Sequence, residues 1–551
     1  MRTTRLTTAA LVAAVVMWWV AAVPPAPRLA QGAPNPELRR RTIAGAFHVH
    51  STLSDGTASQ AEIAAAAARA GLQFVVFTDH GDATRTPAAP RYVDGVLCLD
   101  AVEISTNSGH YVAIGLPPAP YRLGGEAKAV AEDVRRLGGF GIIAHPDSVK
   151  RELAWRDWEM DADGLEWLNA DSAWRSRSWP SLARTMLGYW VRPGAALAAM
   201  VDRPLDTLSR WDAITARRVM PAFAALDAHG GVGRASAEGG RNGVGGVPSY
   251  QASFESFSTR AILRQPPVAD ALADAAALVE AIRAGRSYTV VDGVGKDGWV
   301  EVGAERPGGS AVMGETLTGT GPATLRIRTA RLSDSDLVIL RNGSEISRSD
   351  RGDADVTVSQ PGAYRVEIRQ RGAAGAAPWI LTNPIYIDLQ AAPAAPRTTF
   401  TAMSSLMDGD WRTEHDPASQ AALIRTGSEV GMTYRLDPAQ QSPFAALVVP
   451  IERGRAFNGV SLTLSSKMPA RVSLQFRSAD GSERWRSSVV ASVASEPVTL
   501  RLSDFVPVGT TARPLDDSVA SSLLLVADLV NFLPGSQGGI VVHQLSLGRV
   551  E

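Results

Sequence analysis

The 551-residue sequence predicts an α/β domain followed by two all-β modules. Between residues 41 and 297, short apolar runs alternate with helical stretches, which is typical of βα units around a parallel sheet. After residue 298 the helical pattern gives way to short β-rich runs. A Pro/Ala-rich stretch at 391–397 divides these runs. The expected domains are therefore 41–297, 298–391 and 398–551.

The elements of the α/β domain follow one another in a regular order. A strand at 46–50 leads to an alanine-rich helix at 59–70, which stops at Gly71, and a second strand follows at 74–78. Further strands are expected at 96–104, 111–115, 141–144, 165–168, 223–226 and 287–292, and further helices at 126–137, within 171–220 and at 268–284. This number of units favours a barrel over an open sheet.

The two C-terminal modules show strand patterns alone. Asn342-Gly343, between two β-rich runs of the 298–391 module, is a strong hairpin signal. That module is expected to be an immunoglobulin-like β-sandwich. Residues 398–551 resemble a galactose-binding-like jelly roll. Such a module could bind carbohydrate with Trp411 or Trp485 as a stacking platform, and aromatic core packing is the favoured alternative.

Charge and cysteine content exclude several classes of protein. The chain has 55 Lys and Arg against 56 Asp and Glu, so its net charge of −1 gives no electrostatic signature for nucleic acid. The single cysteine, Cys98, excludes an internal disulfide. It lies in an apolar run and is expected to be a small buried residue without catalytic chemistry.

The first 33 residues are expected to be an export segment and not part of the fold. Its features are the positive residues Arg2 and Arg5, an apolar run at 11–23 and the small residues Ala21 and Ala22. This order is typical of a secretory signal peptide. The alternative is an uncleaved membrane anchor, which Trp18-Trp19 would suit at the interface. Both place the protein outside the cytoplasm, in the periplasm or the extracellular space.

Six of the eight histidines lie between residues 48 and 229, and most stand beside a carboxylate or a Gly/Pro turn. Neutral imidazole and carboxylate are the ligands that zinc, manganese and iron use. The candidate ligands are His48, His50, Asp55, His80, Glu103, His110, His145, Asp227 and His229. This many donors on one domain point to more than one metal ion.

These donors share a position in the predicted fold. His48 and His50 lie on one strand at a spacing that puts both side chains on one face. The other donors end a predicted strand or lie just beside one, and the C-terminal ends of barrel strands are where sites are built. A single histidine there is more often an ordinary polar residue, but burying so many polar groups together without a metal would be costly. His415 and His543, in the β modules, are expected to be ordinary histidines.

Four short motifs resemble those of the polymerase and histidinol phosphatase (PHP) family. They are FHVHSTLSDG at 47–56, FTDHG at 77–81, IAHP at 143–146 and DAH at 227–229. The resemblance covers roughly residues 45–295 and implies a distorted, TIM-like (β/α)7 barrel. It further implies up to three divalent metals (Mn, Zn or Fe) at the C-terminal mouth of the barrel, and phosphoesterase activity.

The same resemblance implies which donors hold each ion. His48, His50, Glu103 and Asp227 would hold the first; Glu103, His110 and His145 the second; and Asp55, His80 and His229 the third. Asp79 would orient an imidazole. Clustered metals lower the pKa of bound water, so the implied reaction is hydrolysis of phosphate mono- or diesters by metal-activated hydroxide. The expected catalytic residues are Glu103, Asp227 and His145.

Substrate contacts are expected from arginines that follow the strand at 165–168. Arg175 and Arg177 could present guanidinium forks to a small phosphorylated substrate, although solvated loop charge is an equal alternative. Two other functions stay open. One is a metal-dependent amide or ester hydrolase on the same barrel, and the other is a non-catalytic envelope protein that binds glycans.

Overall fold

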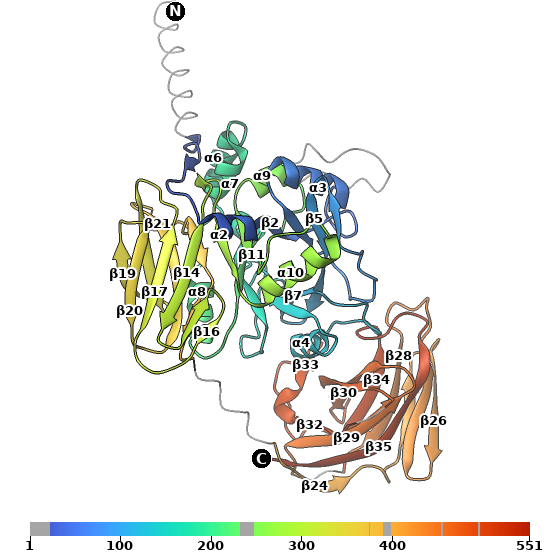
Figure 1. Cartoon of the computed structure of the whole chain (residues 1–551). Coiled ribbons are helices and arrows are strands. Elements are labelled where there is room, and N and C mark those ends of the chain that lie inside the picture. Colours follow the sequence, from blue (N-terminus) through green and yellow to red (C-terminus); the bar gives the residue numbers. More distant parts are fainter. Residues whose placement is uncertain (1–21, 232–246, 374, 390–397, 453–455, 494–495) are drawn as a thin grey trace, which may run out of the picture. The chain divides into compact units, whose positions relative to one another are not determined.

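The computed structural model describes residues 22–231, 247–373, 375–389, 398–452, 456–493 and 496–551 (Figure 1). The first 21 residues of the expected export segment lie outside this part of the chain. Within it, no helix is long and apolar enough to cross a membrane. Two compact units form: unit 1 comprises Met1–Gly81, Pro87–Pro117 and Val134–Ala392, and unit 2 comprises Asp82–Thr86, Pro118–Asp133 and Pro393–Glu551.

Unit 1 begins with a βαβ unit. Strands β2 (Thr42–Val49) and β3 (Phe74–Phe77) pair in parallel, and helix α3 (Gln60–Arg69) connects them. Ser59 caps this helix because its hydroxyl and the Glu62 carboxylate bond reciprocally to backbone amides. The parallel ladder continues into β5 (Val96–Asp100), whose neighbour β4 (Arg91–Val93) is antiparallel. Cys98 in β5 is buried, as expected, and burial raises its pKa to about 11.

A second sheet of unit 1 has the order β10-β9-β8-β7-β6. Its strands are β6 (Val102–Thr106), β7 (Gly109–Ile114), β8 (Phe140–Ile143), β9 (Gly164–Asn169) and β10 (Ala222–Ala225). The pairs β8–β9 and β9–β10 are parallel, whereas β6–β7 and β7–β8 are antiparallel. The expected strand 96–104 is thus two strands, β5 and β6, in different sheets.

The two sheets do not merge into one closed ladder among the described residues. Isolated parallel bridges nevertheless join them at two places, Val49 to Ala228 and His80 to Glu103. The domain is therefore mixed α/β with sheet edges that meet at the strand ends, and a closed barrel is not shown. The residues at both bridges belong to, or adjoin, the candidate metal ligands.

Helices and two further strands complete the α/β part of unit 1. The helices are α2 (Pro36–Arg41), α4 (Ala127–Arg136), which the unit boundary crosses, α5 (Ala170–Arg175), α6 (Trp179–Tyr189), α7 (Pro193–Ala198), α8 (Leu205–Thr215), α9 (Tyr250–Phe254) and α10 (Ala271–Arg283). Strands β11 (Ser258–Ile262) and β12 (Ser287–Val290) extend the β2 sheet in antiparallel fashion. The expected helical region 171–220 is therefore four short helices.

The middle β module shares a sheet with the α/β part. Strand β22 (Ile380–Thr382) pairs with β12, and the sheet continues through β21 (Gly362–Gln370), β23 (Ile385–Ile387), β16 (Thr316–Leu317), β18 (Ser335–Arg341) and β19 (Ser344–Ser349). A separate four-stranded sheet contains β14 (Val300–Arg306), β15 (Gly309–Val312), β17 (Ala323–Thr329) and β20 (Asp353–Val358). The expected boundary at 297/298 thus crosses a continuous hydrogen-bonded sheet. The two-residue strands β1 (Arg28–Leu29) and β13 (Gly295–Lys296) pair separately.

The expected hairpin turn in this module is present. Asn342 and Gly343 connect β18 to β19 and have φ values of 47° and 82°. Two consecutive residues in the left-handed region match the twist of a two-residue hairpin.

Unit 2 is a β-sandwich of two six-stranded sheets (Figure 1). One sheet contains β24 (Phe400–Ser405), β26 (Gln420–Thr426), β27 (Glu429–Arg435), β29 (Gly459–Ser466), β32 (Val498–Arg501) and β35 (Gln537–Val550). The other contains β25 (Arg412–His415), β28 (Phe444–Pro450), β30 (Ala470–Arg477), β31 (Arg484–Ala491), β33 (Val506–Val508) and β34 (Ser522–Asp528). Trp411 and Trp485 are buried in its core, so the stacking-platform hypothesis is wrong for both and core packing is confirmed.

Ion pairs explain why Pro118–Asp133 belongs to unit 2. The buried Arg471 guanidinium donates to Asp133 at 2.7 and 3.0 Å and to Glu132 at 3.0 Å. Arg486 pairs with Glu126 in the same way. The expected α/β range 41–297 is therefore interrupted at this segment.

Candidate metal centre

The structure brings all nine candidate ligands into one connected cluster. Each donor has an imidazole nitrogen or a carboxylate oxygen within 4 Å of at least one other member. They come from segments that follow or form β2, β3, β6, β7, β8 and β10. All nine residues belong to unit 1, so the cluster is internal to one compact body.

Three of these donors have an unusual backbone conformation. His48, His145 and Asp227 have φ values of 63°, 29° and 47°, which place them in the left-handed region. A non-glycine residue there costs on the order of 1–3 kcal/mol and persists only where surrounding contacts impose it. At His48 the β2–β3 register also shifts between Ala46 and Val49. His48, in β2, and His50, directly after it, still face each other, with Nε2 atoms 3.1 Å apart, as their spacing predicts.

Glu103 lies at the centre of the cluster. Its carboxylate is 1 % exposed and contacts five imidazoles. The Oε1 atom lies 2.8 Å from nitrogens of both His110 and His145. The Oε2 atom lies 3.2–3.3 Å from nitrogens of His48, His50 and His80. A carboxylate that presents both oxygens to separate sets of imidazoles has the geometry of a bridging ligand.

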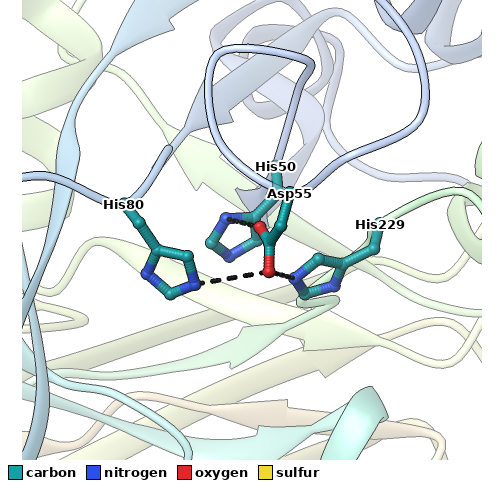
Figure 2. A group of neighbouring side chains, drawn as sticks. All are labelled: His50, Asp55, His80 and His229. Atoms are coloured by element: carbon teal, nitrogen blue, oxygen red, sulfur yellow. Dashed lines mark ion pairs between the residues drawn. The ribbon is translucent and has the colours of Figure 1, made fainter. Parts of the chain in front are cut away.

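Asp55 forms a second centre, shown in Figure 2. Its two oxygens lie 3.3 Å from His229 Nε2, 3.4 Å from His50 Nδ1 and 3.6 Å from His80 Nε2. The loop that carries Asp55 packs closely against the backbone of His50. A Cβ atom on Gly56 would lie 2.3 Å from the His50 carbonyl oxygen. Only glycine permits this approach, and it places Asp55 over the imidazoles.

Asp227 closes the cluster from the end of β10. Its Oδ1 atom lies 3.4 Å from His48 Nε2 and 3.3 Å from His50 Nε2. The His229 ring, two residues later, lies against the His50 ring at a centroid distance of 4.3 Å. The Asp-Ala-His motif therefore supplies donors to both the Glu103 side and the Asp55 side of the cluster.

Two further residues support the cluster, and the sequence reasoning missed them. Glu166 on β9 is fully buried, with Oε1 2.5 Å from His48 Nδ1 and Oε2 accepting from the His145 amide at 2.7 Å. Asn169 donates to Glu166 at 2.9 Å and to Asp227 at 3.4 Å. A carboxylate on the other nitrogen of a ligand imidazole fixes its tautomer and direction. The available signal was an acidic residue inside the apolar run Gly-Leu-Glu-Trp-Leu.

Asp79 acts on the loop and not directly on an imidazole. Its carboxylate accepts from the Ser51 amide at 2.7 Å and from the Ser51 and Ser54 hydroxyls at 2.8 Å. The Ser54 hydroxyl lies 3.3 Å from His50 Nδ1. Asp79 therefore orients the His50 imidazole through Ser54, because its own hydrogen bonds go to Ser51 and Ser54.

The electrostatics of the cluster favour cations. Burial by itself lowers the pKa of His50, but hydrogen bonds to Asp227 and Glu103 outweigh it and raise the pKa to about 9. His145 behaves in the same way, with Glu103 raising its pKa to about 9 against the effect of burial. Burial alone would raise the pKa of Glu103, yet charge on His48 and hydrogen bonds from His110 and His145 hold it well below its usual range. In the metal-free protein, protons therefore occupy a site that attracts positive charge.

The donor set fits divalent metal ions. Three groups have ligand atoms that all lie within 4.8 Å of one another: His50, Asp55, His80 and His229; His48, His50 and Glu103; and His80, Glu103 and His110. Imidazole nitrogens mixed with carboxylate oxygens suit zinc, manganese and iron. The groups overlap at His50, His80 and Glu103, which is the arrangement expected for adjacent ions that share ligands.

The two arginines expected at the substrate differ in position. Arg175 lines a cavity together with Asp227 and His229, and its guanidinium pairs with Asp171. Arg177 does not line that cavity and instead pairs with Asp202 at 2.8 Å and with the Met200 carbonyl. Arg175 therefore stays a candidate for substrate contact, whereas the contacts of Arg177 serve the loop after α7.

No protein-family model and no curated protein matches the chain. Among solved structures, it is similar to a two-domain Bacteroides vulgatus protein described as containing a predicted PHP-like metal-dependent phosphoesterase. The identity is 14 %, the match covers 65 % of this chain and 100 % of that one, and the TM-score is 0.30. It is also similar to a family 11 carbohydrate-binding module of a Clostridium thermocellum cellulase, at 15 % identity over 27 % of this chain and 95 % of that one, with a TM-score of 0.21. These similarities are too low to assign a function.

Proposed function

We propose that the chain is an exported, metal-dependent phosphoesterase of the PHP type. The observation that supports it is the convergence of six imidazoles with Glu103, Asp55 and Asp227 in one cluster. Among the described residues, no lysine or arginine forms an ion pair with any of these three carboxylates. Glu103 and Asp227 are buried, and buried carboxylates without a fixed cationic partner are costly unless metal ions neutralise them.

The proposal assigns the donors to as many as three ions. His48, His50, Glu103 and Asp227 would hold one, Glu103, His110 and His145 another, and Asp55, His80 and His229 a third. The two sheets of unit 1 would then form a distorted barrel with these ions at its mouth. Bound divalent ions would supply an activated water and electrophilic stabilisation of a phosphoryl group.

The chain's own residues would hold this arrangement in place. Glu166 keeps His48 directed at the cluster through the 2.5 Å contact to Nδ1. Asp227 and Glu103 are anionic, because their pKa values are lowered, so either can accept a proton from a nucleophilic water. Arg175 lines the neighbouring cavity together with Asp227 and His229, and its guanidinium would meet a phosphate oxygen.

A substrate-class screen tests this proposal. Phosphomonoesters, phosphodiesters, carboxylic esters and amides are incubated with protein loaded with manganese, zinc or iron. We expect hydrolysis of phosphoesters alone, and its loss in the His48→Ala variant. The matched control is His543→Ala, which alters a histidine outside the cluster that pairs with Glu429. Cleavage of amides without phosphoesters would instead support the amidase alternative.

A second role is proposed for the C-terminal sandwich. A cavity of about 570 Å³ within unit 2 is lined by hydrogen-bonding side chains that include Glu414, Gln475, Arg477 and Arg484. A cavity that combines these polar groups with apolar side chains such as Phe444 and Leu524 suits a small polar ligand such as a sugar. Glycan-array binding that survives chelation, and that Gln475→Ala removes, is the expected result. Binding that chelation abolishes would contradict an independent glycan site.

A further inference from the structure

A cavity of about 210 Å³ adjoins the metal centre inside unit 1. Two candidate metal ligands, Asp227 and His229, form part of its wall. Most of the remaining wall comes from helix α5, from α7 and the residues that follow it, and from the segment 248–257 that contains α9. A group attached to a phosphate at the metal centre would therefore enter this cavity.

The wall of the cavity is mostly apolar. Its apolar side chains are Trp174, Leu197, Met200, Val201, Leu226 and Phe257. Leu197 and Met200 also belong to a small buried cluster with Tyr189, so the wall has packing support from behind. An apolar wall of this kind gains free energy from each buried methylene of a ligand, and gains little from hydroxyl-rich groups.

The charges around the cavity limit the ligand further. Among its described lining residues, Arg175 is the one cation, and it is paired with Asp171, which lines the same cavity. The other ionisable residues of the described wall, Asp227 and His229, are both candidate metal ligands. The described lining side chains therefore supply no excess positive charge for a second phosphate.

We propose that the substrate carries a single phosphate and an uncharged apolar substituent, alkyl or aryl, which occupies this cavity. The size agrees with this class, because an apolar cavity of about 150 Å³ accepts benzene. The proposal rests on the proposed phosphoesterase function and names the substrate class of that site. It excludes nucleoside di- and triphosphates and sugar phosphates as preferred substrates.

Alkylphosphonates of increasing length test the cavity without requiring catalysis. Methyl-, ethyl-, propyl-, butyl- and phenylphosphonate are titrated by calorimetry into manganese-loaded protein. We expect affinity to rise roughly threefold to fourfold for each methylene, and so on the order of 30-fold from methyl to butyl. The same rank order is expected for kcat/KM of the matching alkyl phosphate esters. Affinity that is flat with chain length would overturn the proposal.

One substitution tests whether the dependence of affinity on chain length arises in this cavity. Ala173 on α5 lines the cavity and is half-buried, so Ala173→Phe fills space without opening the core. The butyl-to-methyl affinity ratio is expected to fall from on the order of 30 towards about one. Ala276→Phe, on an exposed position of α10, is the matched control and should leave the ratio unchanged. A ratio that survives in the Ala173→Phe variant would contradict the assignment to this cavity.

The two proposals can fail separately. If phosphonate affinity rises with chain length but no phosphoester is hydrolysed, the phosphoesterase function is contradicted and the role of the cavity is supported. If phosphoesters are hydrolysed at rates that do not depend on chain length, the phosphoesterase function is supported and the proposed substrate class is contradicted. The length series on the unmodified protein decides the question even if Ala173→Phe does not fold.

Discussion

Two carboxylates of unit 1, Glu367 and Glu103, are equally buried but have opposite kinds of partner. Glu367, on β21, accepts hydrogen bonds from three guanidiniums, those of Arg203, Arg365 and Arg369. Glu103, on β6, has five imidazoles around it and no guanidinium among its ion pairs in the described structure. Both carboxylates are anionic, since partners lower both pKa values, that of Glu367 to about 2, although burial alone would raise them.

The difference distinguishes a structural cluster from a candidate metal-binding site. A guanidinium cannot lose its proton in a protein, so the charges around Glu367 are permanent and balanced by the chain itself. An imidazole can release its proton and present a lone pair to a metal. The Glu103 cluster can therefore exchange protons for metal ions, and the Glu367 cluster cannot.

Glu103→Gln gives the largest expected effect on function. The amide cannot bridge two ions, so we expect phosphoesterase kcat/KM to fall on the order of 10⁴-fold and bound metal to decrease. The fold should persist, and circular dichroism with metal analysis checks both. Full metal content in this variant would contradict the assignment of Glu103 as a bridging ligand.

Glu367→Gln makes the same change in the cluster whose partners are guanidiniums. It leaves the buried guanidinium of Arg365, and the partly buried ones of Arg203 and Arg369, without this carboxylate, which should lower the free energy of unfolding by about 3–5 kcal/mol. Metal content per folded chain should stay at the wild-type level. Urea unfolding measures the first quantity, and loss of metal from the folded variant would show that the two clusters are not independent.

The pH dependence of stability should differ between metal-free and metal-loaded protein. Folding raises the pKa of His50 and His145 from 6.5 to about 9, so their stabilisation is fully present below pH 6.5 and is lost as pH rises towards 9. We expect the metal-free protein to lose on the order of 3 kcal/mol for each of the two imidazoles across this interval. The metal-loaded protein should not, because its imidazoles are already neutral ligands. Parallel thermal unfolding curves for the two forms would contradict this.

Glu166→Gln should have an intermediate effect on metal affinity. Its contact with His48 Nδ1 orients that imidazole, and loss of such a partner weakens metal binding about 10- to 100-fold. Titration against a competing chelator measures this change. Glu159→Gln, at an exposed position of the same unit, serves as the control. An unaltered metal affinity would show that the backbone alone orients His48.

His543→Gln should have the smallest effect. This histidine of unit 2 bonds to Glu429 and Ser465, both at 2.7 Å, in a half-exposed position. We expect a loss of about 1 kcal/mol in unfolding free energy and no change in metal content. A drop in bound metal would place a site where the structure shows an ordinary hydrogen-bonded histidine.

The sequence predicted which donors would lie together better than it predicted the sheets that carry them. The donors could be identified because imidazoles and carboxylates at successive strand ends form a pattern of residue types. Glu166 and Asn169 escaped notice because each is a single polar residue, and the candidate ligands that their side chains contact, His48 and Asp227, are over 50 positions distant along the chain. Contacts of that separation leave no local periodicity.

The errors in the fold have similar causes. The apolar run 96–104 contains no turn signal, and its division at Ala101 between two sheets depends on pairing with distant strands. The boundary at 297/298 was placed where helices end, but β12 pairs with β22 across it. Likewise, Asp133 looks like an ordinary helical residue until Arg471 is placed beside it.

Metal analysis of the purified protein tests the central claim most directly. After dialysis against chelator and reconstitution with manganese, zinc or iron, elemental analysis gives the number of ions per chain. The cluster of nine donors predicts about three ions per chain in the wild type, and fewer in the Glu103→Gln variant. A protein that retains no divalent ion from any of these solutions would contradict the account.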